Sequence, residues 1–191
     1  MSLKNISSIV ALVLSLAASA VGAKTITFKF SGQVTYGGPM AVTTGTAVVG
    51  TFSYDLNADP GIKLKNYAQY QFQSPAIMKV SFGGHAVTSD LLDVSLMNNT
   101  KSNVGDIVDV TGTSPVLDGT TLSNGAVGFR IASAYDNNAA LKSTRLPRHF
   151  QVKKFDAGPT MNYGYLQADG GQNGMLLEFS MDSITVINDG K

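Results

Sequence analysis

The chain has 191 residues with 14 Lys and Arg, 13 Asp and Glu and two His, and it contains neither cysteine nor tryptophan. These counts exclude a disulfide framework, a thiolate metal site, a catalytic thiol and a three-histidine zinc site. The nearly neutral charge gives no reason to expect nucleic acid as a partner. All but one of the acids are Asp, which prefers turns, and with 20 Gly the composition favours strands joined by tight turns.

The first 23 residues have the three-part order of a secretory signal peptide. Lys4 supplies the positive start, residues 9–17 are apolar, and Val21-Gly22-Ala23 places small residues at the cleavage position. The apolar run is shorter than the about 20 residues that cross a bilayer. We therefore predict a signal peptide over 1–23, a single domain over 24–191 without a transmembrane segment, and a secreted protein at the cell surface or outside the cell, with the periplasm as the alternative.

The rest of the chain is patterned as short strands. Residues 26–36 alternate apolar and polar side chains, and Gly32 marks a bend or bulge within them. Further strands are expected at 46–55, 76–82, 86–88, 91–97, 106–112, 126–134, 150–155 and 175–187, the last with a bulge near Asp182 where the alternation slips. Helix signals are weak. The pattern predicts an all-β protein with a single antiparallel β-sandwich, of jelly-roll or immunoglobulin-like type.

Two stretches resemble a family. Phe28-Lys29-Phe30-Ser31-Gly32-Gln33-Val34 is followed by Val48-Val49-Gly50-Thr51-Phe52-Ser53-Tyr54-Asp55. This order is similar to the N-terminal half of secreted bacterial proteins of the PEP-CTERM-associated type, although the family's C-terminal sorting tail is absent. The resemblance implies an exported β-sandwich of the envelope or extracellular matrix. It implies no reaction and no catalytic residue.

Four aspartates form the candidate metal site. Asp90 with Asp93, and Asp106 with Asp109, are two carboxylate pairs on neighbouring predicted strands. If these strands are adjacent, the oxygens can converge on calcium, which prefers oxygen ligands. The same carboxylates suit the acid and base of a glycan-cleaving enzyme, or they are simply solvated edge and turn residues.

A basic cluster forms the candidate binding site. It consists of Lys142, Arg145, Arg148, His149, Lys153 and Lys154, in a stretch without an acid between Asp136 and Asp156. Such a patch suits an anionic polymer or the acidic surface of a partner.

The sequence predicts a protein that acts by binding or assembly and not by catalysis, because the nucleophile-elbow, phosphate-loop and dinucleotide motifs are all absent. The expected partners are a second copy of the chain or a cell-surface polysaccharide or protein, with residues 24–36 as the strand for edge-to-edge pairing. The expected cofactor is none, or calcium. Two alternatives remain open: a calcium-dependent, lectin-like glycan-binding module, and a glycan-cleaving enzyme that uses Asp carboxylates.

Overall fold

The computed structural model describes residues 24–99, 104–134, 140–168 and 174–189. The predicted signal peptide, residues 1–23, lies outside the described residues and stays a prediction. Within the described ranges, no helix has the length and apolar character that crossing a bilayer requires.

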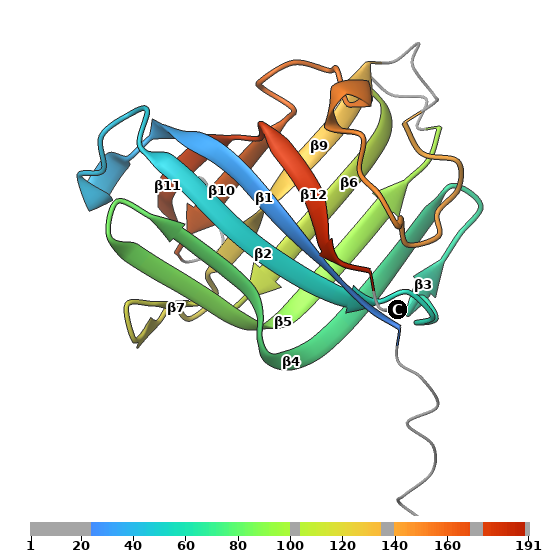
Figure 1. The fold of residues 1–191 in the computed structure, drawn as a ribbon, viewed down its shortest axis with the longest axis horizontal. Helices are drawn as coiled ribbons and strands as arrows, with labels where there is room; N and C mark the ends of the chain where they lie inside the picture. The colour runs from blue at the N-terminus through green and yellow to red at the C-terminus, as the bar shows by residue number, and fades with distance from the viewer. Residues whose placement is uncertain (1–23, 100–103, 135–139, 169–173, 190–191) are drawn as a thin grey trace, which may run out of the picture.

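Eight antiparallel strands close into a barrel (Figure 1). Each pairs with the next in chain order, and the last pairs back to the first. The eight are β1 (Thr25–Tyr36), β2 (Ala47–Asp55), β4 (Tyr67–Phe82), β5 (His85–Met97), β6 (Val104–Thr113), β9 (Ala126–Ala134), β10 (Tyr163–Gln167) and β11 (Met175–Ser180). Four short strands and two 3-10 turns complete the described structure: β3 (Ile62–Lys63), β7 (Val116–Leu117), β8 (Thr120–Thr121), β12 (Ser183–Asn188), η1 (Gly38–Met40) and η2 (Val152–Lys154).

The predicted β-sandwich is wrong, although the all-β class is confirmed. A sandwich has two sheets with separate edges, whereas here β4 pairs with β2 on one side and with β5 on the other. The β4–β5 hairpin runs from Phe82↔His85 to Tyr67↔Met97, so one sheet continues around the molecule. Closure of the sheet on itself removes the edges at which two sheets would have separated.

Aromatic side chains fill the barrel interior. Phe28 stacks on Phe52 with ring centroids 5.0 Å apart, and Phe129 lies 5.4 Å from both Phe30 and Phe52. Two glycines make room for these large rings: a Cβ at Gly50 would lie 2.1 Å from Cζ of Phe30. A Cβ at Gly164 would lie 2.0 Å from the ring of Phe179. Alternating large and small inward residues is how a narrow barrel reaches close packing.

The first strand changes its pairing partner at the position where the sequence predicted a bend or bulge. On one side β1 pairs with β12 over 27–31, and then with β11 at Val34 and Tyr36, so it changes partner at Gly32. The slip in the apolar–polar alternation near Asp182 corresponds to the break between β11 and β12. The other side of β1 pairs with β2 from Thr25 to Gln33. Both edges of β1 are therefore occupied, and residues 24–36 are not available for the strand addition that we expected.

Most expected strands are confirmed, with four main differences. The expected strands at 86–88 and 91–97 are parts of one strand, β5, and the strand at 76–82 extends back to Tyr67. Residues 150–155 form no strand and contain the 3-10 turn η2. The strand β10 was not predicted.

Candidate functional site

Residues 140–162 connect β9 to β10 and cover one end of the barrel (Figure 1). The first part of this connection, residues 140–155, is called the capping segment below. Its apolar side chains are inserted into the barrel core, where Leu141, Leu146, Phe150 and Phe155 are buried. The ring of Phe150 meets that of Phe28 edge-on at 5.0 Å. Burial of four large side chains stabilises the segment by about 1.5–3 kcal/mol per side chain, before the entropy of ordering is subtracted.

Three polar contacts fix the backbone of the capping segment to barrel strands. Oδ2 of the fully buried Asp106 accepts the N–H of Leu141 at 2.7 Å, while its Oδ1 accepts the N–H of Asn99 at 2.8 Å. The hydroxyl of Tyr70 donates to the carbonyl of Thr144 at 2.9 Å. The hydroxyl of Tyr54 donates to the carbonyl of Pro147 at 2.5 Å. The segment is therefore held at its start and twice along its length.

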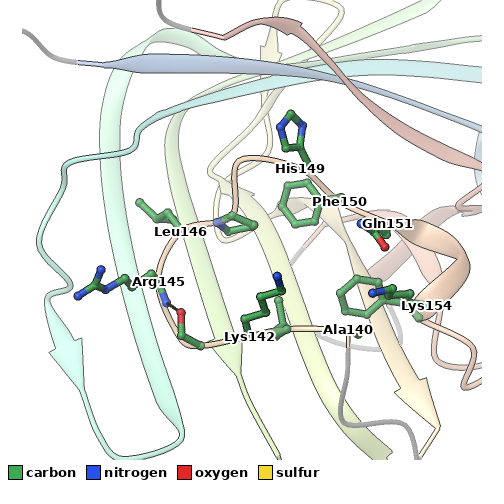
Figure 2. Close-up of a pocket in the computed structure, with 12 residues that line it drawn as sticks. Ala140, Lys142, Arg145, Leu146, His149, Phe150, Gln151 and Lys154 are labelled. Atoms are coloured by element: carbon green, nitrogen blue, oxygen red, sulfur yellow. Dashed lines mark hydrogen bonds between the residues drawn. The ribbon is translucent and has the colours of Figure 1, made fainter.

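The capping segment encloses a hollow of about 230 Å³. Its walls are formed within the segment by Ala140, Leu141, Lys142, Ser143, Arg145, Leu146, Pro147, His149, Phe150, Gln151, Lys154 and Phe155. In Figure 2 the side chains of Lys142 and Lys154 lie on the same side of the ring of Phe150. His149 lies on the far side of that ring, and the guanidinium of Arg145 points away from them.

The charge of this hollow has one sign. Lys142, Arg145 and Lys154 are cations, His149 adds a fourth basic group, and none of the described residues that line the hollow is acidic. A concave surface lined by one sign of charge concentrates counter-ions. The volume is below the about 300–1,000 Å³ of pockets that hold drug-sized ligands. It therefore suits a single anionic group, or one charged unit of a polymer whose remainder stays outside.

The predicted basic cluster and this hollow largely coincide. Lys142, Arg145, His149 and Lys154 line it, whereas Arg148 and Lys153 on the same segment do not. Of the six, Lys154 is partly buried and the others are exposed. The sequence reasoning missed the anchoring residues Tyr54, Tyr70 and Asp106, which lie on distant strands. Tyr54 was detectable only as an inward member of the alternating strand 46–55, a position that hides the role of its hydroxyl.

The four aspartates proposed for calcium do not gather at one place. Asp106 is buried and bound to two backbone N–H groups, and Asp109 forms a two-bond ion pair with Arg130 at 2.7 and 3.0 Å. Asp93 lines the same outer groove as Asp109, while Asp90 is exposed on β5 outside it. Among the described residues, no group of three or more His, Asp or Glu is arranged to hold a metal ion.

The two tyrosine anchors should make the capping segment sensitive to alkali. Burial raises the pKa of Tyr54 well above its ordinary value. Burial also raises the pKa of Tyr70, with Arg145 lowering it and Asp59 raising it by smaller amounts. Because the neutral hydroxyl is the donor, this stabilisation is complete below the unfolded-state pKa of about 10. It is lost as the pH rises through the folded-state pKa values.

We therefore expect the free energy of unfolding to fall as the pH rises above about 10 in urea titrations, by an amount that Tyr54→Phe reduces. Because burial also raises the pKa of Tyr165, the comparison with Tyr54→Phe is the informative readout. If the free energy of unfolding falls equally steeply with pH in the unaltered protein and in Tyr54→Phe, Tyr54 does not contribute.

A scan of protein-family models finds no match for this chain, and comparisons with curated proteins and with solved structures find none either. The resemblance to PEP-CTERM-associated proteins therefore stays a prediction that rests on the residues quoted for it.

Proposed function

We propose that this protein is an exported, non-catalytic binding protein that holds an anionic group of a cell-surface or matrix polymer in the hollow of the capping segment. The observation that carries the proposal is that Lys142, Arg145 and Lys154 line one partly enclosed hollow without an acid among its described lining residues, with the two lysines on the same side of it. Export rests on the sequence of residues 1–23.

The arrangement favours binding over mere surface charge. Lys142 and Arg145 are exposed, and a single exposed ion pair on a mobile support contributes only about 0.2–1 kcal/mol. Here the backbone that carries the cations is fixed by Asp106, Tyr54 and Tyr70, so less entropy is lost when an anion is held. The apolar floor of Leu146 and Phe150 also lowers the local dielectric constant, which strengthens attraction to a bound charge.

Charge reversal at two lining positions should abolish this binding. We expect Lys142→Glu with Lys154→Glu to weaken binding of dextran sulfate and of polygalacturonate at least about tenfold in isothermal titration calorimetry at low salt. Binding by the unaltered protein should also weaken as sodium chloride is raised from about 0.05 to 0.5 M, because salt screens these charges. Neutral dextran should not bind at this site.

The matched control reverses the same number of charges elsewhere. Lys29 and Lys79 are exposed on the outer face, where both are paired with Thr51 of β2. Lys29→Glu with Lys79→Glu should leave most of the affinity. Equal losses in the two double variants would mean that only net charge matters, and the proposed pocket would then be wrong.

A further inference from the structure

A second concave surface lies on the outer wall of the barrel, away from the capping segment. It is a groove of about 420 Å³ across strands β4, β5, β6, β9, β10 and β11, and it is lined by Gln69, Asp93, Ser95, Asp109, Thr111, Arg130, Tyr163, Tyr165, Gln167 and Met175. None of these residues belongs to the basic cluster. All but Met175 carry a polar group, whereas the floor of the hollow in the capping segment is apolar.

One aromatic side chain of the groove reaches across a neighbouring strand. Thr111 on β6 and Tyr165 on β10 are both paired with Gly128 on β9, so two strand spacings, about 10 Å, separate their backbones. Nevertheless the hydroxyl of Tyr165 lies 2.8 Å from Oγ1 of Thr111. The phenol ring must therefore run across β9 over Gly128, which has no side chain to block it and is buried on this outer side.

Burial raises the pKa of Tyr165, as expected for a ring pressed against the sheet. The ring keeps a half-buried exposure, and the ring of Tyr163 lies 6.1 Å away, tilted by 48°. The ring of Tyr165 thus spans β9 at Gly128 and also lines the groove. Its position is fixed before any ligand arrives, which lowers the entropic cost of binding.

The polar groups around this ring both donate and accept hydrogen bonds. Gln69 and Gln167 each offer an amide, Ser95 a hydroxyl and Asp93 a carboxylate. Arg130 is held by Asp109 through two hydrogen bonds, so its guanidinium is oriented in advance. The groove carries two acids and one cation, a net charge that does not favour an anion.

We propose that this outer groove binds neutral saccharide, with one sugar ring stacked on Tyr165. A pyranose has an apolar C–H face that matches an aromatic ring, and its rim of hydroxyls needs partners that both donate and accept. Mixed amides, hydroxyls and carboxylates around a flat ring supply both. The groove is independent of the anion-binding hollow, because the two have no residue in common.

Affinity gel electrophoresis with neutral polysaccharides tests the proposal on the intact protein. The probes are hydroxyethyl cellulose, xyloglucan, galactomannan and glycogen, each cast into a native gel. We expect retardation by at least one of them, and a loss of affinity of at least about tenfold in Tyr165→Leu. Asp93→Ala, which leaves the ring in place, should weaken the same interaction several-fold.

Two further variants keep the outcome clear. Lys142→Glu with Lys154→Glu should leave the retardation unchanged, because it alters the capping segment only. If Tyr165→Leu fails to fold, Tyr163→Leu and Asp93→Ala carry the test. The proposal is overturned if none of the four polysaccharides retards the protein, or if retardation persists unchanged in the groove variants.

Discussion

Asp106→Ala should release the capping segment and destabilise the protein. The carboxylate of Asp106 is fully buried, and it accepts the N–H groups of Leu141 and Asn99. Its removal leaves the N–H of Leu141 buried without that acceptor, which costs about 1–3 kcal/mol. Asn99 is exposed, so its N–H can bond water instead and adds less to the loss. We expect the free energy of unfolding, measured in urea, to fall accordingly, and amide hydrogen exchange to rise first at Leu141 and along the capping segment.

The same substitution should weaken anion binding although Asp106 does not line the hollow. Lys142 follows directly after Leu141, so a mobile Leu141 no longer places the lysine, and polygalacturonate should bind several-fold more weakly. Asp93→Ala is the matched control, since it also removes an Asp carboxylate but from the outer groove. If the two variants lose similar stability and keep the same exchange at Leu141, Asp106 is not an anchor of the segment.

The strands with regular alternation were predictable because their pattern is local. Within β1, Ile26, Phe28 and Phe30 are buried and the residues between them are more exposed, as the sequence indicated. Period-two alternation follows from the pleat of a single strand and needs no knowledge of its neighbours. The glycine at position 32 is also a local signal, and β1 changes its partner there.

Closure of the barrel was not predictable, because it depends on pairing between distant strands. Alternation reports which face of a strand is buried, and that face is the same in a sandwich and in a barrel. The missed strand β10 had a weak pattern as well. Its inward positions are Gly164 and Leu166, so only one of them has an apolar side chain. The glycine that accommodates Phe179 also removes the apolar signal of the strand.

For the candidate sites, too, local patterns were predictable and tertiary contacts were not. The basic cluster was found because its residues are close in sequence and one segment carries them. The calcium hypothesis required Asp106 and Asp109 to face the same way, yet they are three positions apart along a strand, and an odd spacing favours opposite faces. Asp106 is buried, whereas Asp109 pairs with Arg130 on the outer wall. The anchoring hydroxyls of Tyr54 and Tyr70 depend on tertiary contacts that no local pattern contains.

Gly164→Ala tests whether barrel closure depends on the space left at an inward glycine. The added Cβ would lie 2.0 Å from both Cε2 and Cζ of Phe179, which is closer than real Cβ contacts. Phe179 is fully buried and stacks on Phe30, so its ring cannot move without disturbing the core. We expect Gly164→Ala to lower the free energy of unfolding by about 1–3 kcal/mol, measured by urea denaturation.

The matched control is Gly61→Ala, because the nearest atom to a Cβ at Gly61 is 4.0 Å away. Its stability should be unchanged or higher by up to about 1 kcal/mol, since alanine restricts the unfolded chain. Phe179→Leu shortens the obstructing ring, so the double variant with Gly164→Ala should lose less stability than the two single losses added together. Strictly additive losses would show that the contact between residue 164 and the Phe179 ring does not limit closure of the barrel.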